Sequence, residues 1–200
     1  MTPLFYIIIG LFGYIIGSLN SAILVGKLYK KDIKQEGSKN AGLTNVLRVL
    51  GKNAAIMVFV FDMLKGVLSA GLGYLLIKGS VHGALVGGVL TVLGHIFPVF
   101  FNFKGGKGIL ISFSVLLMTD WKIALICLAI FVTIVALTRY VSLGSIIGVT
   151  MAPILAIIFK HDLFFVLSLV FLMVLTIYMH RGNIKRLINK NENKLSFKKK

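Results

Sequence analysis

A polar segment broken by two glycines separates the first two long apolar runs, and its residue types suit the binding of an anion. Gly37 and Gly42 allow backbone conformations in which successive N–H groups converge on one point. The segment also carries short hydrogen-bonding side chains and one guanidinium, which binds phosphate through paired hydrogen bonds: Ser38, Asn40, Thr44, Asn45 and Arg48. Segment 37–48 is therefore a candidate phosphate site. The alternative interpretation is an ordinary loop that precedes a capped helix.

A second segment of the same character spans residues 102–108 and contains three glycines and two lysines. Lys104 and Lys107 supply positive charge, while Gly105 and Gly106 allow close approach of the backbone to a ligand. The spacing differs from the G-x-x-x-x-G-K-[ST] pattern of nucleotide-binding loops. We therefore expect an anion-binding loop of another kind.

Two further polar clusters follow. Residues 139–145 are expected to form a polar turn that presents Ser142 and Ser145. Near the end of the chain His180, Asn183 and Arg186 are spaced so that they share one face of a helix. His180 could act as a general base or could only orient a substrate, and both roles stay open at this point.

The composition is that of an integral membrane protein. Hydrophobic residues make up 58% of the chain and charged residues only 14%, whereas soluble domains contain about 25% charged residues. Residues 1–26, 79–103, 140–159 and 163–180 carry no Asp, Glu, Lys or Arg at all. About 20 apolar residues in a helix cross the hydrocarbon core of a membrane. The single cysteine, Cys127, excludes a disulfide framework.

The pattern predicts an all-α protein with about seven transmembrane helices, at residues 4–26, 53–77, 83–101, 109–119, 123–138, 146–159 and 163–179. Some of these are short or broken. Residues 109–119 span only about 16 Å as a helix, so residues 104–108 are expected to dip into the membrane. Pro98 disfavours helical geometry at Phe97. Residues 27–36 are expected to form a short interfacial helix.

The cations predict the orientation. Eighteen of the twenty-two Lys and Arg residues fall in the regions 27–52, 104–107, 139 and 181–200, three fall in the turns on the opposite side, and Lys65 lies within a span. Cytoplasmic loops carry the excess of cations. We therefore predict an external N-terminus, a cytoplasmic C-terminus and a common anion site of the four polar segments on the cytoplasmic face. The net charge of +16 indicates anionic inner-leaflet lipid as a partner rather than nucleic acid.

Two charged residues lie inside the predicted span 53–77. Asp62 and Lys65 are one helical turn apart and close enough to pair. A structural ion pair and a catalytic pair are both compatible with this spacing. His95 stands near the end of the next span, where we expect a protein-lined cavity.

Taken in order, segments 37–48, 62–66, 94–108 and 180–186 resemble the motifs of the bacterial acyl-phosphate-dependent glycerol-3-phosphate acyltransferases. The resemblance extends from the first span to Glu192. Leu43, Leu110, Ile111 and Asn191 depart from the residues usual in that family, and a Thr is missing at position 111.

The resemblance implies a single transmembrane acyltransferase domain over residues 1–200, with residues 190–200 as a basic tail, in the plasma membrane of a bacterium. It implies transfer of a fatty acyl group from acyl phosphate to the sn-1 hydroxyl of glycerol 3-phosphate, without cofactor or metal. The implied catalytic residues are His180, Asn183, Lys107 and Ser142. The implied phosphate-binding residues are Ser38, Asn40, Gly42, Thr44, Asn45, Arg48, Lys104, Gly105, Gly106 and Ser145. The implied supporting residues are Asp62, Lys65, His95, Arg186 and Glu192.

The expected mechanism combines positioning with electrostatics, and the phosphate of the acyl phosphate accepts the hydroxyl proton. General base catalysis by His180 is the second mechanism. No histidine is followed by Asp five positions later, so the His-x4-Asp signature of acyl-CoA-dependent enzymes is absent. An anion or phosphate-ester transporter is the alternative function, and a lipid-binding scaffold is a third. A transporter binds its substrate near the membrane midplane, whereas these motifs gather at one face. Acyl-chain preference and oligomeric state stay open.

Overall fold

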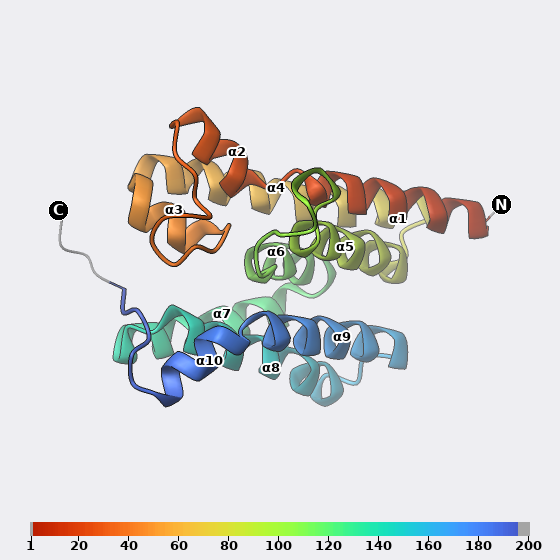
Figure 1. Ribbon diagram of the computed structural model, residues 1–200. Coiled ribbons are helices and arrows are strands. Elements are labelled where there is room, and N and C mark those ends of the chain that lie inside the picture. The colour runs from red at the N-terminus through yellow and green to blue at the C-terminus, as the bar shows by residue number, and fades with distance from the viewer. Residues whose placement is uncertain (1, 196–200) are drawn as a thin grey trace. The chain divides into compact units, whose positions relative to one another are not determined.

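The computed structural model describes residues 2–195, which form ten α-helices and one short 3-10 helix, η1. The contacts divide the chain into two compact units, the first ending at Thr119 and the second beginning at Asp120 (Figure 1). Unit 1 contains α1 (Thr2–Ser18), α2 (Ser21–Leu28), α3 (Leu43–Leu50), α4 (Lys52–Leu76), α5 (Val81–Ile96), η1 (Val99–Phe101) and α6 (Ile109–Thr119). Unit 2 contains α7 (Trp121–Thr138), α8 (Val141–Ile158), α9 (Leu163–Met179) and α10 (Arg181–Ile188).

The helices confirm an all-helical membrane protein. Within residues 2–195, five segments are long and apolar enough to cross a membrane: Pro3–Leu28, Lys52–Leu76, Val81–Phe101, Trp121–Thr138 and Val141–Ile158. Helices α9 and α10 meet at a bend of 59° and make a sixth if they are taken as one broken span. Large apolar side chains cover the outer surfaces of these helices, as a lipid environment requires; Leu75, Leu137 and Leu163 are among the most exposed.

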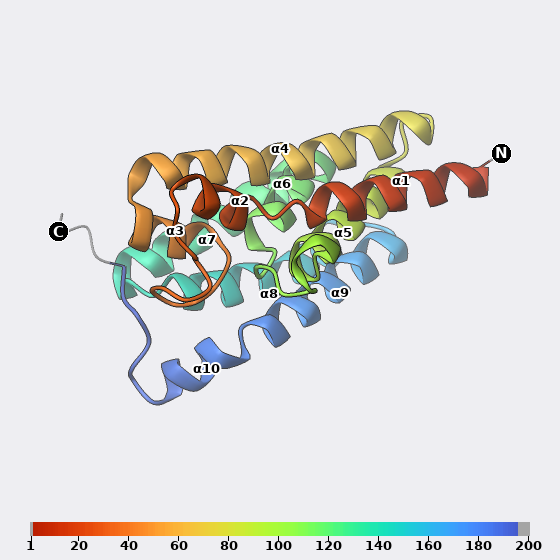
Figure 2. The same cartoon turned by 45° about the horizontal axis from the view of Figure 1, so that its top comes forward.

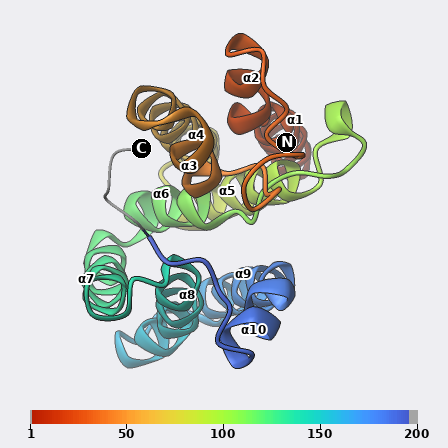
Figure 3. The same cartoon turned by 60° about the vertical axis from the view of Figure 1, so that its left-hand side comes forward.

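Helix α5 is the centre of unit 1, where it packs against α1, α4 and α6 (Figures 2 and 3). Glycines allow these helices to approach closely. A Cβ atom at Gly17 would collide with the backbone carbonyl of Thr91, and one at Gly87 would collide with the carbonyl of Ser69. Small residues at helix contacts are the usual means of packing in membranes, where the hydrophobic effect does not drive helices together.

The predicted first span, 4–26, is two helices rather than one. The break lies at Leu19 and Asn20, and Asn20 caps α2 because its Oδ1 accepts the N–H of Ile23 at 3.1 Å. A short polar side chain favours this capping position over a helix interior. The broken helix still forms one membrane segment.

The predicted interfacial helix at 27–36 is wrong. Helix α2 ends at Leu28 and the chain continues in turns. Lys30 takes a φ of 55°, which lies outside the right-handed helical region. The carboxylate of Asp32 then accepts the N–H of Lys34 at 2.9 Å, a turn contact that competes with helix formation.

Helices α6 and α9 begin and end at the predicted residues, whereas α8 begins earlier than predicted. Ser142 and Ser145 therefore lie in the first turns of a helix and not in a polar turn. Gly144 serves close packing, since a Cβ there would press on Phe131 and Val135 of α7. Of the predicted tail 190–200, residues 190–195 are described, and Leu195 donates its N–H to the carbonyl of Arg139. The last five residues, with their three lysines, lie outside the described part.

Candidate active site

Asn45 organises the first glycine-rich segment. Its side chain is buried in α3, and its Oδ1 accepts the N–H of Ser38 at 2.7 Å. Its Nδ2 donates to the carbonyls of Ile33 and Glu36 at 2.9 and 3.0 Å. Gly37 takes a φ of +60° directly beneath the amide, where a side chain would collide with it. The amide of Asn45 thus shapes the loop; direct phosphate contact by Asn45 stays a prediction.

The other residues of segment 37–48 lie around this framework. Gly42 is the N-cap of α3, and its carbonyl accepts the N–H groups of Asn45 and Val46. Thr44 and Arg48 follow at helical spacing i, i+4, so they share one face of α3, and Arg48 is exposed. Ser38 and Asn40 are half-buried. The segment therefore places the positive end of a helix among small polar side chains, which suits an anion, while Arg48 lies in the last turn of α3.

The second glycine-rich loop is fixed on the C-terminal end of α5. Gly105 and Gly106 donate their N–H groups to the carbonyls of Ile96 and His95 at 3.0 and 3.1 Å. The Cα of Gly106 is wedged between two groups, because a Cβ there would meet both the Nε2 of His95 and the carbonyl oxygen of Ala41. Through Ala41 the structure brings loop 102–108 and segment 37–48 into contact.

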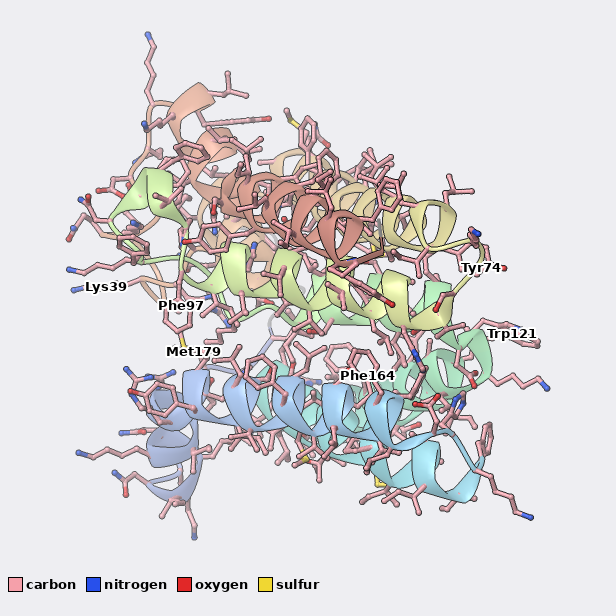
Figure 4. The ribbon with its side chains drawn as sticks, turned by 90° about the vertical axis from the view of Figure 1, so that its right-hand side faces the viewer. Lys39, Tyr74, Phe97, Trp121, Phe164 and Met179 are labelled. Carbon is pink, nitrogen blue, oxygen red and sulfur yellow. The ribbon has the colours of Figure 1, made fainter. Side chains whose placement is uncertain are left out.

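Both glycine-rich segments lie at one end of unit 1. Figure 4 shows Lys39 and Phe97 at the end of the unit opposite Tyr74. Lys104 is exposed and Lys107 is half-buried. Cations therefore gather where the two loops meet.

A buried ionic cluster lies next to these loops, and the predicted pairing of Asp62 with Lys65 is confirmed. The Nζ of Lys65 is 2.9 Å from Asp62 Oδ1, which also accepts a hydrogen bond from Ser21 Oγ at 2.6 Å. The same Nζ donates to the carbonyl of Leu19 at 2.9 Å, and His95 Nδ1 lies 3.8 Å from Asp62 Oδ1. The sequence reading missed Ser21. The available signal was that a buried carboxylate needs donors and that Ser18, Asn20 and Ser21 can supply them.

In unit 2 the side chain of Glu192 joins three of the predicted residues. Its Oε1 accepts hydrogen bonds from Asn183 Nδ2 at 2.7 Å and Ser142 Oγ at 3.1 Å, and its Oε2 accepts one from Arg186 Nε at 2.7 Å. The Glu192 side chain is only 5% exposed. It therefore ties α8 to α10. Ser145, one turn further along α8, is buried and donates to the carbonyl of Val141.

His180 lies at the bend between α9 and α10. Its ring is buried, and Nδ1 is 2.8 Å from the carbonyl oxygen of Thr176. A carbonyl only accepts hydrogen bonds, so Nδ1 carries a hydrogen and donates to Thr176. This contact sets the orientation of the ring at the bend. The sequence gives no sign of this contact, because every residue in a helix has a carbonyl four positions before it.

The structure thus assembles two groups of predicted residues, one in each unit. In unit 1 it joins segment 37–48 with loop 102–108, and in unit 2 it joins Ser142, Asn183, Arg186 and Glu192. The expectation that all four segments form one anion site stays a prediction.

The sequence profile of the family described as glycerol-3-phosphate acyltransferase matches residues 7–190. The chain belongs to this family. It is 46% identical over 197 residues to a glycerol-3-phosphate acyltransferase of Finegoldia magna, with 98% of each chain covered. It is 41% identical over 199 residues to that of Clostridioides difficile, with 97% of each covered.

A solved acyltransferase structure shares the fold. The crystal structure of PlsY, an integral membrane glycerol 3-phosphate acyltransferase, in its glycerol 3-phosphate form, matches with a TM-score of 0.91 at 32% identity, covering 96% of each chain. Its lysophosphatidic acid form matches with a TM-score of 0.88, also at 32% identity. These comparisons favour the acyltransferase over the transporter and the lipid-binding scaffold.

Replacing Glu192 tests its role as the residue that joins α8 and α10 in this acyltransferase. Glu192→Gln turns an amide toward Arg186 and weakens a charge-assisted contact. We expect a loss of about 1.5–3 kcal/mol in transition-state stabilisation, measured as kcat/KM, with a lower melting temperature.

The control is Glu36→Gln. Glu36 pairs with Lys31 at 3.1 Å, but the side chain of Glu36 is 40% exposed. An exposed pair contributes at most about 1 kcal/mol. Equal effects of the two substitutions would contradict the role given to Glu192.

Proposed function

We propose that this chain transfers a fatty acyl group from acyl phosphate to the sn-1 hydroxyl of glycerol 3-phosphate and releases lysophosphatidic acid and inorganic phosphate. The observation that carries the proposal is membership of the glycerol-3-phosphate acyltransferase family along almost the entire chain. The glycerol 3-phosphate and lysophosphatidic acid forms of PlsY, whose fold the chain shares, support the acceptor and the product.

The reaction exchanges one C–O bond for another and transfers one proton. The sn-1 oxygen attacks the acyl carbonyl carbon, and the bond from that carbon to the phosphate oxygen breaks. The hydroxyl proton ends on the departing phosphate, which is a base in its own right. The protein then has to hold two phosphate groups and stabilise negative charge, work suited to fixed cations and backbone N–H groups.

The proposed phosphate-binding groups are the cations and loops of unit 1, together with Ser145. Arg48 lies in the last turn of α3, and Lys104 and Lys107 flank the two glycines that are hydrogen-bonded to α5. His180, Asn183, Ser142 and Lys107 are proposed to act at the reacting groups. The contact of His180 Nδ1 with the carbonyl of Thr176 supports this, because it holds the ring in one orientation at the bend between α9 and α10.

We place the chain in the plasma membrane of a bacterium as a single transmembrane domain with about seven spans. The N-terminus lies outside, and the C-terminus and active site face the cytoplasm. In this topology the short helix α6 is the fourth of the seven segments. The distribution of Lys and Arg supports the orientation, since eighteen lie on one side and three on the other.

Anionic phospholipid of the inner leaflet is the proposed lipid partner. Four lysines line a cavity of about 470 Å³ at the end of α2: Lys27, Lys30, Lys31 and Lys34. Isoleucines 23 and 33 form its apolar wall, and Lys27 lies 5.5 Å from the ring centre of Phe101. Asp32 also lines the cavity, so the four lysines leave it a net positive charge, which together with the apolar wall suits an anionic lipid headgroup. Activity that is indifferent to anionic lipid in reconstituted vesicles would contradict this partner.

The donor provides the direct test of the proposed function. We expect the purified protein to form lysophosphatidic acid from acyl phosphate and glycerol 3-phosphate, with one phosphate released for each product. Acyl-CoA should not replace acyl phosphate, because the chain lacks the His-x4-Asp signature. Equal rates with the two donors would contradict the mechanism.

His180 separates the two mechanisms. If His180 only orients the acceptor, His180→Gln should raise KM for glycerol 3-phosphate at least as much as it lowers kcat, and we expect this result. General base catalysis would instead lower kcat by roughly 10²–10⁴ and remove the acidic limb of the pH–rate profile that is due to His180. A large loss in kcat with unchanged KM and a lost limb would show that the orienting role is wrong.

Topology can be tested with single cysteines in a Cys127→Ala background. Cysteines at Lys78, Lys122 and Lys160 should react with a membrane-impermeant thiol reagent added to intact cells, whereas a cysteine at Asn191 should not. External labelling at Asn191 would overturn the proposed orientation.

A further inference from the structure

We propose that His95 and Asp62 are positioning residues for acyl transfer, which hold the cationic loop 102–108 against segment 37–48. The proposal rests on the proposed function, since it concerns how the phosphate-binding cations are kept in place. Neither residue is assigned direct contact with a substrate. Both are almost completely buried, at 3% and 2% exposure.

Asp62 is held rigidly from three elements. Ser21 at the start of α2 donates to its Oδ1 at 2.6 Å, and Lys65 pairs with it at 2.9 Å from the next turn of α4. Lys65 also donates to the carbonyl of Leu19 at the break between α1 and α2. The carboxylate is therefore a fixed point that joins α2, α4 and the helix break.

The ring of His95 bridges this fixed point to the loop. On one side Nδ1 faces Asp62 Oδ1 at 3.8 Å and has no hydrogen-bond partner within the described part of the chain. On the other side Nε2 lies so close to Gly106 that a Cβ on the glycine would collide with it. A buried polar ring without a hydrogen bond at Nδ1 is uncommon and calls for a reason other than stability. Its position between the carboxylate and the loop supplies that reason.

The backbone around His95 completes the attachment. The carbonyls of His95 and Ile96 accept the N–H groups of Gly106 and Gly105, the two residues between Lys104 and Lys107. Gly106 also lies against the carbonyl of Ala41 in segment 37–48. A shift of the His95 ring would therefore move the loop, its two lysines and the contact with segment 37–48 together.

The test combines kinetics with hydrogen exchange. His95→Ala removes the ring between Asp62 and Gly106 and leaves the substrate-binding cations in the chain. We expect KM for at least one of the two phosphate substrates to rise about tenfold or more, with kcat within about threefold. Exchange of the Gly105 and Gly106 amides should become at least about tenfold faster.

A double variant guards against loss of folding. Asp62→Asn alone leaves Lys65 buried without its partner, so Asp62→Asn with Lys65→Met removes both charges at once. We expect the same rise in KM, because the carboxylate that faces His95 is gone. Ser69→Ala is the matched control: Ser69 is fully buried on the same helix and its hydroxyl has no partner among the described residues. Ser69→Ala should leave both the KM values and the exchange rates of the Gly105 and Gly106 amides unchanged.

Values of KM and exchange rates within about threefold of wild type in folded His95→Ala would overturn the inference. A fall in kcat alone, with both KM values and the loop exchange unchanged, would also overturn it, since that is the result of a merely structural role. Failure of the wild-type protein to form lysophosphatidic acid would instead contradict the proposed function, and the exchange measurement would still decide whether His95 holds the loop.

Discussion

Polar groups inside a membrane must be satisfied by the protein itself, and the carboxylate of Asp62 is where unit 1 meets this requirement. Ser21 and Lys65 satisfy the carboxylate, and Lys65 in turn satisfies the carbonyl of Leu19. The break between α1 and α2 can therefore exist within a membrane segment without an unpaired backbone group at that carbonyl. Removing one partner of such a buried pair typically costs about 3–5 kcal/mol. The cluster thus satisfies the helix break directly, and His95 Nδ1 at the end of α5 faces it at 3.8 Å.

Unit 2 applies the same principle with a different acid. Glu192 accepts hydrogen bonds from Ser142, Asn183 and Arg186, so its charge is compensated and the ends of α8 and α10 are joined. In both units an acidic group is buried and paired, while Arg48 and Lys104 remain exposed in the glycine-rich segments. Paired acids contribute order and exposed cations contribute positive potential. This arrangement suits an enzyme whose two proposed substrates both carry phosphate.

The sequence predicted the features that follow from local pattern. The predicted bounds of α6 and α9 were correct because each apolar run ends abruptly at residues that are charged or typical of turns. The pairing of Asp62 with Lys65 was correct because helical spacing brings residues i and i+3 together. The break at Asn20 and the start of α8 at Val141 were missed. Hydropathy does not reveal a helix cap inside an apolar run. In the sequence, a glycine that serves helix packing, such as Gly144, cannot be distinguished from a glycine that forms a turn.

The candidate site residues were chosen by their residue types. The contacts that they make in the fold are with partners that lie far away in the chain. The amide of Asn45 shapes its own loop through Ser38, Ile33 and Glu36, a role that the sequence did not indicate, and its contact with phosphate stays a prediction. Gly106 packs between His95 and Ala41, so three separate segments meet at this glycine. No periodic pattern in the sequence predicts this contact. Motif spacing therefore located the candidate site, whereas the division into binding and positioning residues required the fold.

The central claim is that the two glycine-rich segments hold a substrate phosphate, and an experimental structure of the protein with glycerol 3-phosphate bound tests it most directly. The account predicts phosphate oxygens at about 2.7–3.1 Å from nitrogen atoms of Arg48, Lys104 or Lys107, or from backbone N–H groups of segments 37–48 or 102–108. A phosphate bound without contact to any of these groups would contradict it.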